Sequence, residues 1–173
     1  GFDKLWEVCD RSGIEIELLL GDTGSTDSET LALLDAPPRG VDVTRGMRYQ
    51  FSRCNNDLFE QARYSTVLFM NNDVFIDECP EGVVEVFQTF TKDPSLGAVG
   101  VVLLFENGTV QHAGVELLRS PELFAVPFHP GAKQHPLHAL GVSFASSAVT
   151  GAFLMTSSDH YARSGGFDER YEA

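Results

Sequence analysis

The sequence has few basic residues, and this shortage excludes one class of partner. Twelve Lys and Arg stand against twenty-five Asp and Glu, which gives a formal net charge of −13 at pH 7. The basic residues form no cluster that could neutralise a row of phosphates, so nucleic acid is a poor partner. An acidic surface favours solubility and by itself identifies no substrate.

Cysteine is also scarce, and long apolar runs are missing. Cys9, Cys54 and Cys79 are odd in number and far apart, in neither a CxxC motif nor a disulfide framework. We therefore expect reduced thiols, as in a cytoplasmic protein. No run approaches the ~20 apolar residues that cross a bilayer, and nothing at the N-terminus resembles a signal peptide. The sequence predicts no transmembrane segment and a cytoplasmic location, with the inner face of the membrane left open.

The apolar residues that are present predict an α/β fold. The hydrophobic share is 43 % over 173 residues, which is enough to bury one core. Helical and strand patterns alternate in the first half, and this order is typical of a mostly parallel sheet flanked by crossover helices. The expected helices there are 5–9, 28–34 and 52–63, and the expected strands are 14–20, 41–44 and 66–70.

The second half predicts a different arrangement. A helix opens at Cys79-Pro80 and ends near Asp93-Pro94. A strand over 97–105, the turn signal Glu106-Asn107-Gly108 and a return strand over 109–117 predict an antiparallel hairpin. The remaining elements expected from the pattern are a long loop or lid over 118–148, a strand over 149–156, a helix over 157–164 and a loop over 165–170.

Three polar residues follow the apolar run 66–70, and they are the strongest candidates for a ligand site. In an open α/β sheet, ligands bind beyond the carboxyl ends of the strands, where Asn71, Asn72 and Asp73 are expected. A carboxylate flanked by amides is a hard-oxygen site suited to Mg²⁺ or Mn²⁺. The alternative is that these residues only turn the chain, and this segment alone leaves both open.

Asp22 lies in a glycine-flanked turn after an earlier strand. Glycines there allow a flat ring or a phosphate to approach the backbone, and the carboxylate can accept a hydrogen bond from a ring N–H such as that of uracil. If the strands are parallel, Asp22 and Asp73 converge on one edge of the sheet. A rival interpretation is an aspartic protease, because residues 18–26 resemble its catalytic strand. That fold is all-β and needs a second Asp-Thr-Gly or a dimer, whereas the residues after Thr26 are patterned as a helix.

Six blocks follow one another along the chain, namely GDTGSTD (21–27), FSRCNN (51–56), VLFMNND (67–73), QHAGV (111–115), TGAFLM (150–155) and GGFDE (165–169). Together they resemble the family-2 glycosyltransferases of GT-A fold, and they are closest to the bacterial rhamnosyltransferase-like members. The resemblance implies a GT-A (Rossmann-like) fold and a single partial domain over 1–173. It also implies that the family's first strand and the block carrying the catalytic base lie outside these residues. Strands that run mainly antiparallel would count against it.

The resemblance implies roles in nucleotide binding for five residues. Asp22 matches the acidic residue that reads the base, and Asn56 matches an Asn that lines the nucleotide pocket. Asn71, Asn72 and Asp73 match the Asp-x-Asp block, whose last carboxylate holds the divalent cation on the donor's diphosphate. Asn71 replaces the first Asp of that block. Ribose binding by Asn71 survives the change, but the site carries one negative charge fewer for the metal.

Further residues match the blocks that border the donor sugar and the acceptor, namely Thr150, Gly151, Ala152 and Gly166. His112 lies on the expected return strand, where it is a candidate to contact a phosphate or an acceptor hydroxyl. The alternative for His112 is a hydrogen-bonded packing residue.

The catalytic base is expected beyond Ala173. In the family it is usually the Asp of a Glu-Asp pair a few residues after the Gly-Gly-Phe-Asp block. Asp168 and Glu169 are fallback candidates, and the alternative is that they cap or salt-bridge the local turn.

Two groups in the expected lid are weaker candidates. The spacing of His129, His135 and His138 fits no zinc pattern, so a polar loop is the expectation. Three aromatic residues of the same segment are candidates to stack on a sugar face, namely Phe124, Phe128 and Phe144.

The function that the resemblance implies is inverting, metal-dependent transfer of a sugar. The donor would be a nucleotide sugar of UDP or dTDP type, and the acceptor a saccharide or a lipid-linked saccharide. A metal neutralises the charge that develops on the leaving diphosphate. A non-catalytic nucleotide-sugar-binding domain is the second hypothesis, and the aspartic protease is the third.

Overall fold

The structure is a computed structural model that describes residues 2–76, 78–118, 126–135 and 143–171. The chain forms two compact units, and we describe each by itself. Unit 1 comprises Gly1–Val67, Phe75–Glu85 and Ser157–Ala173, and unit 2 comprises Leu68–Val74 and Val86–Thr156.

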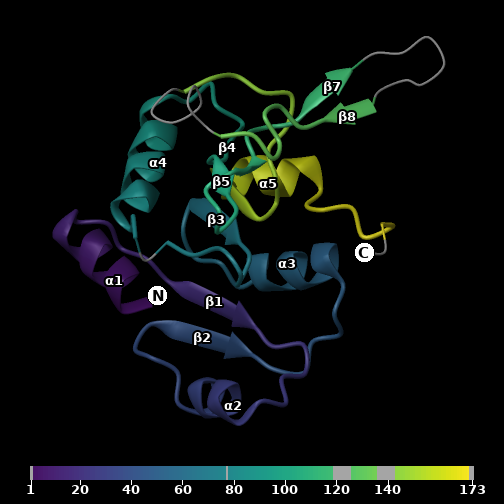
Figure 1. The fold of residues 1–173 in the computed structure, drawn as a ribbon. Coiled ribbons are helices and arrows are strands. Elements are labelled where there is room, and N and C mark those ends of the chain that lie inside the picture. Colours follow the sequence, from purple (N-terminus) through teal and green to yellow (C-terminus); the bar gives the residue numbers. More distant parts are fainter. Residues whose placement is uncertain (1, 77, 119–125, 136–142, 172–173) are drawn as a thin grey trace. The chain divides into compact units, whose positions relative to one another are not determined.

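Unit 1 contains a parallel strand pair. The strands β1 (Leu18–Gly21) and β2 (Val41–Thr44) pair from Leu18 with Val41 to Gly21 with Thr44. Figure 1 shows the two strands side by side. The helix α2 (Ser28–Asp35) connects them, which is the crossover that parallel neighbours require.

Local sequence signals set the helix ends of unit 1. The carboxylate of Asp27 caps α2 by accepting from the Thr30 N–H at 2.9 Å. The Gln50 side chain caps α3 (Phe51–Phe59) in the same way. The helix α5 (Ser158–Ser164) ends at Gly165, whose φ of 86° is a left-handed conformation that glycine adopts without strain. The first helix of the chain is α1 (Phe2–Arg11), which buries Leu5, Val8 and Cys9.

Unit 2 is built from short strands. The strand order β3-β9-β4 forms its largest sheet, while β5 pairs with β6 and β7 pairs with β8. Phe153, Met155 and Val110 are buried in its core. The elements β3 and α4 contribute residues to both units. The bounds are β3 (Thr66–Met70), α4 (Glu81–Lys92), β4 (Ala98–Val99), β5 (Leu103–Leu104), β6 (Val110–His112), β7 (Glu116–Leu118), β8 (Val126–Phe128) and β9 (Phe153–Ser157).

The mixed α/β class and the helix–strand alternation up to β3 are confirmed. The mostly parallel sheet is not confirmed, and the antiparallel pairings count against the GT-A fold that the resemblance implies. Only β1 and β2 are shown to pair in parallel among the described strands, whereas β4-β9, β5-β6 and β7-β8 are antiparallel. The sheets are also small, with two or three strands each.

Several predicted boundaries are wrong, and one predicted hairpin is confirmed. The helix expected over 52–63 ends at Phe59, and the strand expected over 97–105 is split into β4 and β5. Gly100 lies in the gap between them, against the Val149 side chain. The hairpin closes where expected, because the Phe105 N–H donates to the Thr109 carbonyl at 2.8 Å.

The segment expected to be a lid is only partly described. Residues 126–128 form β8, which pairs with β7, and Phe128 and Phe144 are exposed. Phe124 and His138 lie outside the described residues.

Candidate functional site

Asp22 is held in a turn at the end of β1. Its side chain is 5 % exposed, and the carboxylate accepts hydrogen bonds from the N–H groups of Gly24 at 3.3 Å and Ser25 at 2.9 Å. It also pairs with Arg45, with 3.3 Å between Oδ2 and Nε. Hydrogen bonds from the side chain and the N–H of Ser25 lower the pKa of Asp22 more than the charge of Arg45 does. The carboxylate is therefore an oriented anion at neutral pH.

The surroundings of Asp22 argue against the protease. The residues after Thr26 form α2, so an all-β fold is excluded. An aspartic protease carboxylate shares a proton with a second carboxylate, whereas Asp22 pairs with a guanidinium. The same guanidinium contacts Asp35 at 2.6 Å.

Asn56 holds the loop after α5. Its Nδ2 donates to the Phe167 carbonyl and to Glu169 Oε1, both at 2.9 Å, and its Oδ1 accepts from the Tyr161 hydroxyl at 2.5 Å and the Phe167 N–H at 3.0 Å. An Asn side chain has two donor hydrogens and two acceptor sites. All four are used, and they join α3 to the loop over 165–169.

Other side chains of unit 1 complete this attachment. Gln50 Nε2 donates to the Glu169 carbonyl at 2.9 Å. Phe51 contacts Phe167, with ring centroids 5.3 Å apart. Gly166 has a φ of 74°, and a Cβ there would lie 2.7 Å from Asn56 Oδ1. A glycine is therefore required at this close approach.

Asp168 and Glu169 contact groups of their own loop or of α3. Asp168 accepts from the Arg170 N–H at 2.9 Å and pairs with its guanidinium at 2.6 Å. The hydrogen bonds from Arg170 lower the pKa of Asp168 to about 2. The geometry of Asp168 thus matches the salt-bridged turn that was the alternative to a catalytic base.

In unit 2, four predicted site residues form one hydrogen-bonded series. The Asn71 N–H donates to the Ala152 carbonyl at 3.0 Å. The Ala152 N–H donates to the Thr150 hydroxyl at 3.2 Å. The Thr150 N–H donates to Nε2 of His112 at 3.2 Å. The series connects the end of β3, the segment before β9 and the end of β6.

His112 is the most buried member of this series. It is 5 % exposed, and its ring lies edge-on to that of His129, with centroids 6.0 Å apart. Burial, and secondarily the charge of His129, lowers the pKa of His112. A neutral imidazole nitrogen can accept the Thr150 N–H, whereas a protonated one cannot.

Asn72 and Asp73 are exposed, and Asn71 is half-buried. These are oxygen ligands, which hard divalent cations prefer. Within the described residues, no group of three or more His, Cys, Asp or Glu is arranged to hold a metal ion. The oxygen atoms of residues 71–73 therefore fit Mg²⁺ or Mn²⁺ only if the phosphates of a substrate bind the ion together with one carboxylate.

The predicted site residues divide between the two units. Unit 1 contains Asp22, Asn56, Gly166, Asp168 and Glu169, and unit 2 contains Asn71 to Asp73, His112 and Thr150 to Ala152. Because each unit is described by itself, the shared edge expected for Asp22 and Asp73 stays a prediction.

Sequence reasoning missed several partners of these residues. Arg45, Gln50 and Tyr161 each contact a predicted site residue, yet none lies in a matched block. Gln50 carried no clear signal, because the residues preferred as helix N-caps are Ser, Thr, Asp, Asn and Gly. Nothing local in the sequence indicates that Tyr161 reaches Asn56, 105 residues away along the chain.

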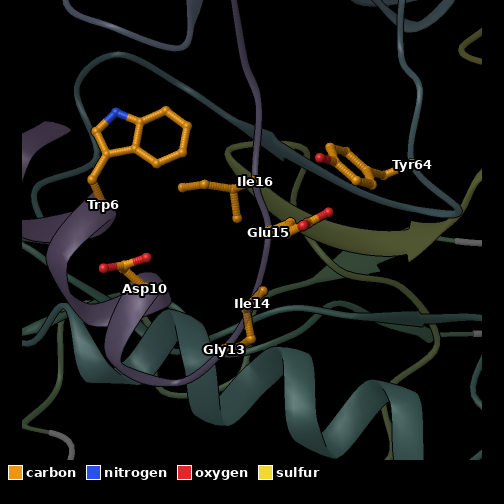
Figure 2. Close-up of a pocket in the computed structure, with 7 residues that line it drawn as sticks. All are labelled: Trp6, Asp10, Gly13, Ile14, Glu15, Ile16 and Tyr64. Atoms are coloured by element: carbon orange, nitrogen blue, oxygen red, sulfur yellow. The ribbon is translucent and has the colours of Figure 1, made fainter.

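Unit 1 also contains a pocket of about 420 Å³ that no prediction anticipated. Trp6 and Asp10 of α1, residues 13–16 and Tyr64 line it. Figure 2 shows the Trp6 indole nitrogen turned away from Asp10, and this buried nitrogen has no hydrogen-bond partner in the described part of the chain. No predicted site residue borders the pocket, so it carries no assigned role.

Over the described ranges, none of the helices combines the length and the apolar character needed to cross a bilayer.

Two curated proteins are similar to most of this chain. The O-antigen biosynthesis protein RfbC of Myxococcus xanthus is 33 % identical over 170 residues, which is 90 % of this chain and 12 % of that protein. The uncharacterized protein y4gI of Sinorhizobium fredii (strain NBRC 101917 / NGR234) is 30 % identical over 158 residues, which is 88 % of this chain and 17 % of that protein. The chain thus spans less than a fifth of either relative. No family model matches it.

Proposed function

We propose that this chain is the nucleotide-sugar-binding part of a glycosyltransferase that acts in polysaccharide biosynthesis. The observation that carries the proposal is the 33 % identity, over 90 % of the chain, to a protein named for O-antigen biosynthesis. O-antigens are polysaccharides, and their assembly requires glycosyl transfer. The six sequence blocks that resemble family-2 glycosyltransferases support the same function.

On the donor side, we assign Asp22 to the base of the nucleotide. The amides of Gly24 and Ser25 fix the carboxylate, and its lowered pKa keeps it charged. A fixed carboxylate can accept a ring N–H of uracil or thymine, which suits a donor of UDP or dTDP type. Arg45 holds the second oxygen and so limits rotation of the group.

The exposed end of β3 is assigned to the ribose and the diphosphate. Asn71 would bind the ribose hydroxyls and Asp73 would hold the divalent cation, with Asn72 between them. A bound cation would neutralise the charge that develops on the leaving diphosphate. Asn71 is itself anchored, because its N–H donates to the Ala152 carbonyl.

For the acceptor, the proposal is inverting transfer to a saccharide or a lipid-linked saccharide. The attacking hydroxyl needs a proton acceptor whose pKa lies near the working pH. Asp168 does not meet this requirement, since its ion pair with Arg170 lowers the pKa to about 2. Asp168 is therefore not proposed as the base.

The same observation favours a second candidate function. With Asp168 occupied by Arg170, binding of a nucleotide sugar without catalysis is the alternative. Both functions require the donor site, and they differ only in turnover.

A transfer assay separates the two functions. The chain is incubated with radiolabelled UDP-sugars and dTDP-sugars, Mn²⁺ and a panel of saccharide acceptors, and product is followed by chromatography. Time-dependent transfer or donor hydrolysis, lost in Asp73→Ala, supports the enzyme. Donor binding without turnover, both in this chain and in a longer chain of the same protein, supports the binding domain. Failure to bind any donor would contradict both.

A further inference from the structure

The hydrogen-bonded series of unit 2 ends on a buried imidazole, and this arrangement defines what His112 can do. Its Nε2 accepts the Thr150 N–H at 3.2 Å, and the residue is 5 % exposed. A ring nitrogen that accepts a backbone N–H carries no proton, so the neutral ring has its hydrogen on Nδ1. A ligand cannot use Nε2 while Thr150 does.

The other end of the series is the polar tip of β3. Thr150 receives the Ala152 N–H on its hydroxyl, and the Ala152 carbonyl receives the Asn71 N–H. Each of these bonds involves backbone or a short side chain, and only Thr150 and Ala152 lie between His112 and Asn71 in the series.

We propose that His112 is a positioning residue, which holds the segment Thr150-Gly151-Ala152 and thereby fixes Asn71 for the donor. The inference rests on the proposed function, because a donor at Asn71 is part of it. It replaces direct contact between His112 and a phosphate or hydroxyl with an action through Thr150.

The protonation state of His112 determines whether the bond from Thr150 to His112 can form. Protonation would place an N–H opposite the Thr150 N–H and remove the acceptor. Among the described residues packed against β6, β5 has no titratable side chain, whereas the turn over 129–134 contributes His129 and Lys133. The charge of His129 lowers the pKa of His112, so this neighbour opposes a charge on the His112 ring.

Amide hydrogen exchange, measured by nuclear magnetic resonance, tests the series directly. His112→Phe keeps a ring but removes the acceptor, and His112→Gln places an amide oxygen near the position of Nε2. We expect exchange at Thr150 and Asn71 to accelerate about tenfold in His112→Phe, as for the loss of one hydrogen bond, and to recover in His112→Gln. His160→Phe, which removes an exposed imidazole of α5, should leave both amides unchanged.

Donor affinity gives the second readout, with UDP and Mn²⁺ as the probe. His112→Phe should weaken binding about tenfold, and His112→Gln should restore it. Unchanged exchange at Thr150 and Asn71 in His112→Phe would overturn the proposal. It would also be overturned if His112→Gln restored slow exchange but not affinity, because the imidazole would then touch the ligand.

Two controls keep these outcomes separable. If the unsubstituted protein binds no nucleotide, the proposed function fails, while the exchange rates still decide whether His112 positions the segment. If His112→Phe does not fold, a pH titration of the unsubstituted protein replaces it. The Thr150 amide shift should then follow the titration of the His112 ring, and an amide shift independent of that ring would contradict the proposal.

Discussion

At the scale of single residues, Asp22 shows how a turn prepares a carboxylate. Two backbone N–H groups and one guanidinium contact an almost fully buried side chain, so its direction and charge are set before any ligand arrives. The sequence indicated the position of Asp22 through the flanking glycines. It could not indicate Arg45, because that pairing depends on how β1 and β2 align.

This arrangement makes Asp22 a source of acid sensitivity. Its pKa in the folded protein lies below the ordinary value of 3.8, so its stabilising effect is complete above pH 3.8 and is lost as the pH falls through the lowered value. Asp22→Asn should lower the urea midpoint at pH 7, and the difference from the unsubstituted protein should shrink below pH 3.8.

Asp35→Asn is the matched control for this prediction. Asp35 contacts the same Arg45, but its side chain is 71 % exposed, so its removal should change the midpoint little. Equal losses in the two variants, or a loss in Asp22→Asn that is independent of pH, would contradict the account of Asp22.

At the scale of elements, the presence and the order of the helices were predictable, whereas the sheet was predictable only in part. Asp27, Ser157 and Gly165 are local signals of helix ends, and all three act as such in the structure. Strand pairing depends on contacts between distant residues, so the sequence pattern did not reveal that β4 pairs antiparallel with β9. The expectation of a mainly parallel sheet came from the first half of the chain and does not describe the second half.

In the loop over 165–169, structural contacts explain why several residues of the sequence block have the types they have. The resemblance places this block at the border of the donor or the acceptor, and that role stays a prediction. Gly166 and Phe167 are explained by the attachment to α3, where Asn56 uses all four of its hydrogen-bonding positions. Gly165 is explained by the left-handed end of α5. The same residue types can serve packing or ligand binding, so a sequence block alone does not distinguish the two roles. The contacts in the structure do distinguish them.

Adjacent glycines of this loop provide a matched pair of substitutions. Gly165 and Gly166 both have positive φ, so alanine at either position costs about 1–2 kcal/mol of strain. Only at Gly166 would the added Cβ meet Asn56 Oδ1, at 2.7 Å, whereas at Gly165 it meets open space. Gly166→Ala should therefore lose about 1–3 kcal/mol more unfolding free energy than Gly165→Ala.

Urea denaturation followed by circular dichroism measures this difference. Asn56→Ala removes the oxygen that the Cβ would meet, so the penalty of Gly166→Ala over Gly165→Ala should become smaller in that background. Similar losses for the two glycine variants would show that the contact with Asn56 does not shape this loop.

At the scale of the whole molecule, the chain is a small part of much longer relatives. The chain spans 12 % of RfbC and 17 % of y4gI, so the activity of either complete protein is not assigned to it. What the chain does contain is a fixed carboxylate in unit 1 and a hydrogen-bonded polar tip in unit 2. The account requires both to act on one class of ligand, a nucleoside diphosphate.

The most direct test is the metal dependence of nucleotide binding. Melting temperatures are compared for the chain with UDP or dTDP, in Mn²⁺ and in a chelator, and for Asp73→Ala and the exposed control Glu106→Ala. The account predicts that nucleotide with Mn²⁺ raises the melting temperature more than nucleotide with chelator, and that only Asp73→Ala loses the metal-dependent part. No shift with any nucleotide, or an equal Mn²⁺-dependent shift in Asp73→Ala, would contradict it.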